Sequence, residues 1–340
     1  MDQSLRDIVL RVTGADSILG SQRVQSLWSG YGEILRVKLG GADRASVIVK
    51  HVAPPTDADH PRGWATDLSH QRKLRSYQVE SNWYRDWSDR CSSDCRVPAC
   101  LHVQPSETQA VFVLEDLDAV GFSLRKSALR GSDVQSCLRW LAEMHAIFMN
   151  CEPNESLPNE SLPNESWPDG LWPVGTYWHL ETRPDEWNVM ESGELKQKAK
   201  HIDETLSNCY FQTLVHGDAK VANFCFADSG SDVAAVDFQY VGGGCGIKDV
   251  AYFLGSCLSE NECEQREDEL LGYYFDELTK RLAVHHPQVD ASEVQAEWRS
   301  MYCFAWADFN RFLLGWCPGH HKLTGYSQRM TSLALGQVGA

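Results

Sequence analysis

Four polar residues lie within the segment LVHGDAKVANF, and a fifth ends the next apolar run, VAAVDF. They are His216, Asp218, Lys220, Asn223 and Asp237. A carboxylate can orient or deprotonate an acceptor hydroxyl, and carboxylate and amide oxygens ligate the Mg²⁺ ions that bridge nucleotide phosphates. A single Asp–Asn pair in a loop usually forms a turn or a cap. Several polar groups at these spacings are rarely a coincidence, and Asp218, Asn223 and Asp237 supply the set of groups that phosphoryl transfer needs.

The first part of the chain is predicted to be a small β-rich lobe. Apolar runs separated by the turn-rich stretches SGYG and GGADR predict a three-stranded antiparallel meander within residues 22–52. A helical pattern follows over residues 66–90, and the run AVFVLEDL predicts a further strand from 110 to 117. These elements define a predicted first lobe at residues 1–118.

The second part of the chain has a different pattern. Residues 132–151 carry apolar side chains at helical spacing. Further helical patterns follow toward the C-terminus, at 247–259, 262–285, 292–316 and 323–335. Short β-like runs, TLVHG, NFCFA and VAAVDF, lie before them. We therefore predict an α+β protein in which residues 119–340 form a larger, mainly helical lobe.

The composition excludes several classes of partner. The chain has 340 residues, with 31 Lys and Arg against 47 Asp and Glu, and a net charge of −16. This acidity disfavours nucleic acid and anionic lipid as partners, because both require clustered cations. No apolar run reaches the roughly 18 residues of a membrane-spanning helix, and the N-terminus does not match a signal peptide. We expect a cytoplasmic protein without a membrane span, whose cysteines are mostly reduced.

Two local features have simple interpretations. Cys91, Cys95 and Cys100, with a histidine just beyond, resemble a zinc site only loosely, so packed or surface thiols are the preferred interpretation. The repeat NESLP, NESLP, NESWP at residues 154–168 has a proline in each copy. Proline excludes a continuous helix or a central strand, so we predict an exposed loop.

The pattern H-G-D-x-x-x-x-N followed by D-F-Q resembles the catalytic and metal-binding loops of the aminoglycoside phosphotransferase and choline kinase group. These proteins phosphorylate small molecules and are related to protein kinases. The detail is most similar to the ecdysteroid-kinase-like branch. The resemblance extends over roughly residues 25–325 and includes VIVKHV, YQVESNWYRDW, VLEDL, LAEMHA and WADFNRFLLGW. It implies a bilobal protein-kinase-like fold that uses ATP and Mg²⁺.

By this resemblance, the central motif supplies the catalytic residues. Asp218 matches the catalytic base, and His216 matches the histidine that braces the catalytic loop. Lys220 follows the base at a position where many protein kinases carry a lysine that can meet the transferring phosphate.

The resemblance also assigns the metal ligands. Asn223 and Asp237 match the two residues that bind magnesium. Asp249 lies beyond them at the start of a helical pattern, and we interpret it as an anchor for the helix or the loop rather than as a ligand.

The nucleotide clamp is expected in the first lobe. Strand alternation in ASVIVKHV places Lys50 on a largely apolar face, where a cation needs an anion. The resemblance makes Lys50 the lysine that holds the α- and β-phosphates, with a helix glutamate as its partner. Glu80 fits this role because it lies on the same side of its predicted helix as Tyr77 and Tyr84.

Two further segments are candidate nucleotide contacts. Gly30 and Gly32 in SGYGEI allow a phosphate to approach the backbone closely, but Leu35 replaces the third glycine of G-x-G-x-x-G. A phosphate loop and a simple hairpin turn both stay open. The segment that includes Glu115 and Leu117 resembles the linker between kinase lobes, where backbone groups meet the adenine edge.

The acceptor is expected against the second lobe, which is rich in aromatic residues. Ordinary core packing explains most of them. Two acceptor classes fit the rest: a hydroxylated, fairly hydrophobic molecule such as a steroid-like alcohol, which the resemblance favours, or an amino-alcohol cation held by aromatic faces. Asp308 and Arg311 either orient the substrate or form a buried ion pair.

The leading hypothesis is an ATP- and Mg²⁺-dependent phosphotransferase, a small-molecule kinase that phosphorylates a hydroxyl group. The alternative is a catalytically quiet nucleotide-binding protein or scaffold, which only the incomplete glycine loop supports. Protein-kinase activity is disfavoured because no A-P-E element follows the D-F-Q at activation-loop distance.

Overall fold

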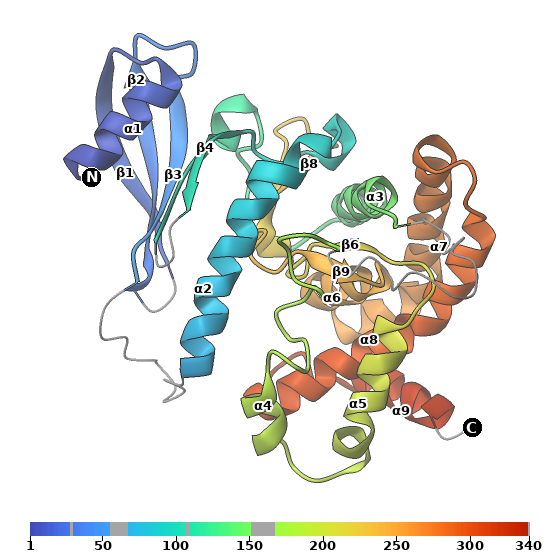
Figure 1. The fold of residues 1–340 in the computed structure, drawn as a ribbon. Helices are drawn as coiled ribbons and strands as arrows, with labels where there is room; N and C mark the ends of the chain where they lie inside the picture. The colour runs from blue at the N-terminus through green and yellow to red at the C-terminus, as the bar shows by residue number, and fades with distance from the viewer. Residues whose placement is uncertain (28–29, 55–66, 106–108, 151–166, 339–340) are drawn as a thin grey trace, which may run out of the picture. The chain divides into compact units, whose positions relative to one another are not determined.

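The computed structural model describes residues 1–27, 30–54, 67–105, 109–150 and 167–338 (Figure 1). The chain divides into two compact units. The first comprises Met1–Arg125 and Cys225–Gln239, and the second comprises Lys126–Phe224 and Tyr240–Ala340. The NESLP repeat, apart from Trp167 and Pro168, lies outside the described residues.

A five-stranded antiparallel sheet forms most of the β-structure of the first unit. Its strands are, in spatial order, β1 (Ser17–Ser26), β2 (Gly32–Gly40), β3 (Ser46–Val52), β5 (Ala110–Glu115) and β4 (Cys100–Pro105). The predicted meander and the predicted strand at 110–117 are therefore confirmed. Strand β4 was not predicted, although Leu101 and Val103 alternate with polar residues there.

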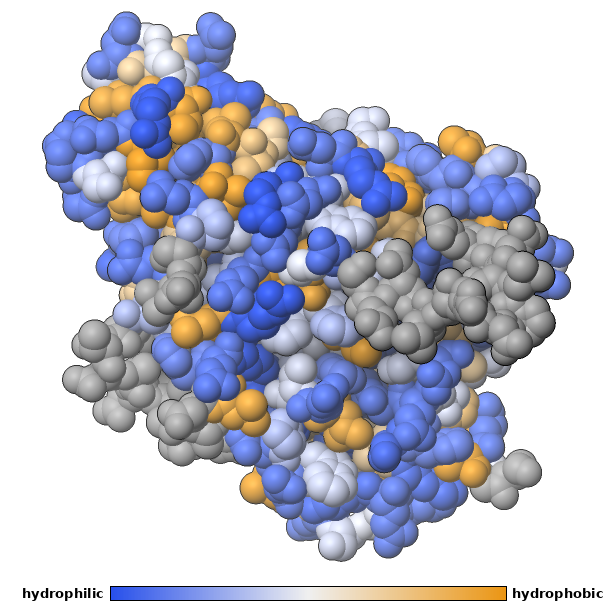
Figure 2. All heavy atoms as spheres, in the orientation of Figure 1, coloured by the Kyte–Doolittle hydropathy of each residue, from blue (hydrophilic) through white to orange (hydrophobic). Residues whose placement is uncertain are grey.

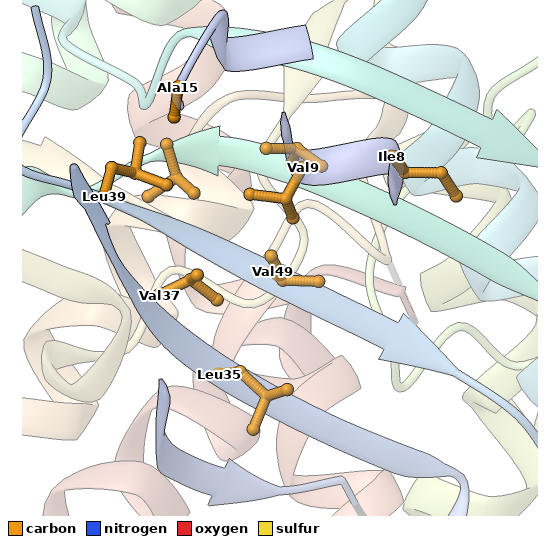
Figure 3. Packing of buried hydrophobic residues seen from close by; sticks show 9 residues of the cluster. Ile8, Val9, Ala15, Leu35, Val37, Leu39 and Val49 are labelled. Atoms are coloured by element: carbon orange, nitrogen blue, oxygen red, sulfur yellow. The ribbon is translucent and has the colours of Figure 1, made fainter. Parts of the chain in front are cut away.

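The helix α1 (Gln3–Thr13) covers one face of this sheet and was not predicted. Its N-terminus is capped by Asp2, whose carboxylate accepts the backbone N–H of Leu5 at 2.9 Å. Figure 3 shows Ile8 and Val9 of α1 packed over the strands of the sheet. The complete cluster consists of Ile8, Val9, Ala15, Leu35, Val37, Leu39, Val47, Val49 and Val113.

The predicted helix at 66–90 is present as α2 (Asp67–Asn82), which continues into the π-helical turn Trp83–Trp87. This turn directs two aromatic rings at Phe238. The ring of Trp83 stacks on Phe238 with centroids 4.4 Å apart, and Tyr84 meets it edge-on at 6.1 Å. These aromatic contacts hold the D-F-Q segment against the α2 region of the first unit, although the two are far apart in the sequence.

Short strands flank the central motifs. The pair β7 (Phe224–Phe226) and β8 (Val233–Ala235) precedes the D-F-Q, and β6 (Thr213–Val215) pairs with β9 (Gly242–Gly244) beside the H-G-D. Each central motif therefore starts at or next to the end of a strand, and the strand fixes the position of the backbone that carries the motif.

The second unit is mainly helical, as predicted. Its helices are α3 (Gly131–Ile147), α4 (Pro184–Val189), α5 (Glu194–Ser207), α6 (Ile247–Cys257), α7 (Glu260–His285), α8 (Ala291–Trp316) and α9 (Gly325–Val338). Helix α3 packs along α7, and α8 contacts α5, α6 and α9 (Figure 1). The α+β fold class is confirmed. The helices α4 and α5 were not predicted.

The surface is mixed in polarity. Figure 2 shows a largely hydrophilic face on which hydrophobic residues gather over the N-terminal sheet and α1. In the part of the chain that the structure describes, no helix combines the length and the hydrophobicity needed to cross a bilayer.

We predict that Leu35→Ala destabilises the first unit. Leu35 is 4% exposed within the cluster under α1, so its truncation should lower the free energy of unfolding by about 2 to 5 kcal/mol through lost burial and a cavity. Urea denaturation followed by tryptophan fluorescence measures the change. Leu19→Ala is the matched control, because Leu19 lies on β1 and is 69% exposed. Equal midpoints for the two variants would contradict the packing described.

Candidate active site

The lysine of strand β3 pairs with the glutamate of α2 inside the first unit. The Nζ of Lys50 donates to both carboxylate oxygens of Glu80, at 2.9 and 2.7 Å, and both residues are buried. The rings of Tyr77 and Phe112 lie 5.7 and 5.9 Å from the same Nζ. The structure therefore brings the predicted pair together in an apolar setting, where each charge needs the other.

Carboxylates keep the amine of Lys50 protonated. Burial by itself would lower the pKa of Lys50, because an apolar environment disfavours the charged form. The charges of Glu80 and Asp237 outweigh burial and raise the pKa above its ordinary value. The Oδ1 of Asp237 lies 3.5 Å from the lysine Nζ. Lys50 thus links strand β3 to both α2 and the D-F-Q.

The D-F-Q holds Asp237 in an unusual backbone conformation. Asp237 has φ 71°, in the left-handed region that residues other than glycine rarely adopt. The Nε2 of Gln239 donates to Asp237 Oδ1 at 2.7 Å, while the Oε1 of Gln239 accepts from Lys73 at 2.7 Å and from Ser76 at 3.2 Å. Helix α2 therefore positions the Asp237 carboxylate, which is 38% exposed, through the amide of Gln239.

A buried carboxylate at the start of α6 anchors the H-G-D loop. Asp249 accepts the backbone N–H groups of His216 at 2.5 Å and Gly217 at 3.0 Å, and the Nε2 of His145 lies 3.3 Å away. The interpretation of Asp249 as a loop anchor is confirmed. The Nδ1 of His216 accepts the backbone N–H of Asp218 at 3.2 Å, so this histidine contacts the loop that it was expected to brace.

The same loop requires glycine at position 217. Gly217 has φ 77°, and a Cβ there would lie 2.1 Å from the carbonyl oxygen of Tyr240 and 2.8 Å from the backbone nitrogen of Thr176. Thr176 itself has φ 109° and is buried, an uncommon conformation for a β-branched residue. Sparsely populated conformations of this kind concentrate at functional sites.

Three side chains donate hydrogen bonds to the carboxylate of Asp218. Tyr252 Oη donates to Oδ1 at 3.1 Å, while Lys220 Nζ and Asn223 Nδ2 donate to Oδ2 at 2.6 and 3.0 Å. Burial, followed by the charge of Asp218, raises the pKa of Tyr252 well above its ordinary value, so its hydroxyl keeps the proton that it donates. Donors on both oxygens hold the carboxylate in one orientation. Tyr252 was not among the predicted site residues.

Asn223 and Asp237 have the donor chemistry that magnesium requires. The amide nitrogen of Asn223 donates to the carbonyl and the carboxylate of Asp218, at 2.8 and 3.0 Å. This orients the amide, and among the described residues no group donates to its Oδ1. An amide oxygen and a partly exposed carboxylate are each the kind of oxygen that Mg²⁺ binds, and the assignment of both residues as its ligands stays a prediction.

Of the two predicted loop glycines, Gly30 lies between β1 and β2, and Gly32 is the first residue of β2. Gly30 has φ 74° and its N–H donates to the carbonyl of Leu27 at 3.2 Å. Gly32 has φ 132°, and a Cβ there would lie 2.0 Å from the carbonyl oxygen of His51. The close approach of strand β3 is therefore enough to explain why position 32 requires a glycine, without a role in binding phosphate. A role of both glycines in binding phosphate stays a prediction.

The predicted adenine-binding segment is held within the first unit. The carboxylate of Glu115 accepts from Arg96 and, at 3.1 Å, from the backbone N–H of Ala99. Leu117 is buried, and its carbonyl accepts the N–H of Phe122 at 2.9 Å. Side chains are thus used for packing at both positions, and the expected contact between their backbone and adenine stays a prediction.

An aromatic cluster surrounds Tyr252 beside Asp218. It contains Trp178, Tyr252, Phe309, Phe312 and Leu313, with Tyr177, Trp316 and Leu323 packed against it. The hydroxyls of Tyr177 and Tyr252 lie 3.3 Å apart. Lys322 places its Nζ 4.9 Å from the ring centroid of Tyr252 and 5.6 Å from that of Phe309. No motif pointed to Lys322, because a lysine in a loop has no distinctive pattern in sequence.

The environment of Lys322 lowers the affinity of its amine for a proton. Burial lowers the pKa of Lys322 to about 8, although the charge of Asp218 acts in the opposite direction and that of Lys220 adds to the decrease. Lys322 therefore lies within electrostatic range of the predicted base.

Asp308 and Arg311 form a buried structural network. Arg311 donates to Asp308 at 3.1 and 2.7 Å and to the carbonyl of Trp178 at 2.6 Å, while Trp178 Nε1 donates to Asp308 at 3.0 Å. Both charged residues are 1% exposed. Of the two earlier interpretations, the ion pair is the one observed.

The cysteines of the first unit form no evident metal site. The Sγ atoms of Cys91 and Cys95 are 3.8 Å apart. Among the described residues, no group of three or more His, Cys, Asp or Glu side chains could hold a metal ion. Burial raises the pKa of Cys100 to about 11, so its thiol stays protonated at neutral pH.

Comparison with models of protein families shows the family of the chain. It matches the ecdysteroid kinase-like family over residues 73–170 and 179–286, which together are more than half of its length. The chain therefore belongs to the ecdysteroid kinase-like family. No curated protein matches the sequence.

Solved structures share the fold at low sequence identity. The structure is similar to choline kinase from Cryptosporidium parvum Iowa II, with a TM-score of 0.53, 10% identity, and 99% of this chain and 96% of that chain covered. It is also similar to a protein of Ralstonia eutropha JMP134 provisionally described as an aminoglycoside phosphotransferase, with a TM-score of 0.50, 12% identity, and coverage of 98% and 95%. The chain therefore has the fold of small-molecule phosphotransferases.

We predict that Glu80→Leu destabilises the protein by about 3 to 5 kcal/mol, because it leaves the charge of Lys50 buried without its main partner. The double variant Lys50→Met/Glu80→Leu should recover most of this loss, since two apolar side chains of similar size can replace a buried ion pair. Chemical denaturation of both variants measures the difference. A double variant no more stable than Glu80→Leu would argue against a tightly coupled pair.

We predict that the amine of Lys322 titrates near pH 8. Reductive ¹³C-methylation followed by NMR titration measures it, with Lys322→Met identifying the signal. Between about pH 8 and the ordinary lysine value of about 10.4, the unfolded chain binds more protons at this residue. The stability of the wild type relative to Lys322→Met should therefore rise with pH over this range. A midpoint at the ordinary lysine value would contradict the burial described.

Proposed function

We propose that this protein is an ATP- and Mg²⁺-dependent phosphotransferase that transfers the γ-phosphoryl group to a hydroxyl group of a small molecule. The proposal rests on one observation above all. The side chain of Asp218 is 8% exposed, and Tyr252, Lys220 and Asn223 fix its carboxylate on a loop that Asp249 anchors. Such preorganisation suits a group that must orient an acceptor hydroxyl and receive its proton.

The remaining residues take the roles that nucleotide chemistry requires. Lys50, kept protonated by its carboxylate neighbours, would hold the α- and β-phosphates. Asn223 Oδ1 and the carboxylate of Asp237 would hold Mg²⁺, which when bound neutralises phosphate charge. Lys220, whose side chain is 39% exposed, can leave Asp218 to meet the transferring phosphate. The hydroxyl would release its proton to Asp218 as its oxygen bonds to phosphorus.

We predict that Asp218→Asn lowers phosphoryl transfer by about 10²- to 10⁴-fold, because the amide cannot accept the proton of the acceptor hydroxyl. Wild type with ATP and Mg²⁺ is first screened against a library of hydroxyl compounds by ATP consumption, and product is verified by mass spectrometry. Asp268→Asn is the matched control, since the Asp268 side chain is 98% exposed in the same unit.

The nucleotide measurement separates the two hypotheses. Asp218→Asn should keep the magnesium-dependent affinity for ATP that wild type has, because Asp218 is assigned to the acceptor. Equal turnover in wild type and Asp218→Asn would reject Asp218 as the base. Magnesium-dependent ATP binding without transfer to any compound would favour a quiet nucleotide-binding protein.

A further inference from the structure

The aromatic faces beside Asp218 are already occupied by cations of the protein itself. Lys322 lies over the rings of Tyr252 and Phe309. On the other side of the cluster, the guanidinium of Arg183 lies 5.9 Å from the ring centroid of Tyr177 and 5.4 Å from that of Phe312. Each aromatic face attracts a cation through its quadrupole. A cationic acceptor would have to compete with these two side chains for the same rings.

The two cations differ in how their polar atoms are satisfied. Arg183 donates to the carbonyl of Tyr177 at 2.6 Å and pairs with Glu186 at 3.1 Å. Nothing in the described part of the chain accepts a hydrogen bond from Lys322 Nζ, and no carboxylate there lies within ion-pair distance of it. An ammonium that is half-buried among aromatic rings without an acceptor is costly unless a ligand supplies one.

The carboxylate of Asp218 compensates for the charge of Lys322 only in part, because burial still lowers the pKa of this lysine. Its oxygens accept from Lys220, Tyr252 and Asn223, so one ammonium already balances its charge. The predicted base Asp218 therefore has two lysines near it, Lys220 at hydrogen-bond distance and Lys322 within electrostatic range. An acceptor with its own ammonium next to the reacting hydroxyl would add a third positive charge, which is repelled.

We propose that Lys322 is a specificity-determining residue for the acceptor, and that it selects compounds with a neutral or anionic oxygen near the reacting hydroxyl over amino alcohols. Polyols and hydroxy acids are the favoured classes. The inference rests on the proposed function for the position of the acceptor at Asp218. Of the two acceptor classes that the sequence left open, it disfavours the amino-alcohol cation, because the aromatic cluster already binds cations of the protein.

Three compounds with one scaffold test this selection. Tropate, 1-phenylethane-1,2-diol and phenylglycinol share a primary hydroxyl and a phenyl ring, and carry a carboxylate, a hydroxyl or an ammonium on the adjacent carbon. Their dissociation constants are measured by calorimetry or ligand-observed NMR at pH 7, with Mg²⁺ and a non-hydrolysable ATP analogue present. Wild type should bind tropate or the diol about tenfold or more tightly than phenylglycinol, as expected for one charge-assisted hydrogen bond.

Variants of Lys322 assign the selection to this residue. Lys322→Met should abolish the preference, and Lys322→Glu should reverse it in favour of phenylglycinol. Lys200→Met is the control, because the Lys200 side chain is 83% exposed on α5, and it should keep the wild-type order. Circular dichroism verifies the fold, and Lys322→Met alone suffices if the charge reversal does not fold.

The outcomes separate this inference from the proposed function. A binding order that depends on Lys322, without phosphoryl transfer to any compound, supports the selection and counts against the enzymatic activity. Transfer that proceeds with an unchanged order in Lys322→Met overturns the selection and leaves the activity standing. Tightest binding of phenylglycinol by wild type, or binding of none of the three up to their solubility limits, also overturns the selection.

Discussion

The H-G-D loop depends on the buried carboxylate of Asp249. A charge in the interior must be compensated locally, and here two backbone N–H groups of the H-G-D and the ring of His145 do so. Because Asp249 lies in the first turn of α6, this interaction fixes the loop to that helix. The next turn of the same helix supplies Tyr252, whose hydroxyl reaches the carboxylate of Asp218. One helix thus anchors the loop and orients the side chain that the loop carries.

In the first unit, an ion pair compensates the buried charges. Lys50 and Glu80 neutralise each other across strand β3 and α2, and Gln239 connects α2 to the carboxylate of Asp237. Neither charge could be buried there alone. Since the rings of Trp83 and Phe238 stack beside this network, aromatic packing and polar contacts both hold the D-F-Q against α2. The unusual backbone of Asp237 is stabilised by contacts on either side of it.

Local charge and overall charge have different consequences in this protein. The net charge of −16 disfavours a polyanionic partner. Charges beyond about 8 Å are largely screened at physiological salt, so a ligand responds mainly to the groups it touches. In the proposed function, Lys50, Lys220 and Lys322 would be such groups. An acidic protein can therefore still bind an anionic ligand through a few cations at contact distance.

The sequence by itself determined the α+β class and most strands and helices, because alternation and helical spacing are local signals. The pairing of Lys50 with Glu80 followed from the family resemblance together with the helical position of Glu80. The sequence missed α1, β4, α4 and α5. It also missed the roles of Tyr252 and Lys322, and it left the Asp308–Arg311 pair undecided. The roles of these side chains depend on which residues meet in space across α6, α8 and the loop before α9. The spacing of residues along the chain does not encode such contacts. Only the tertiary structure decided them, because burial and charge compensation are properties of neighbours in space.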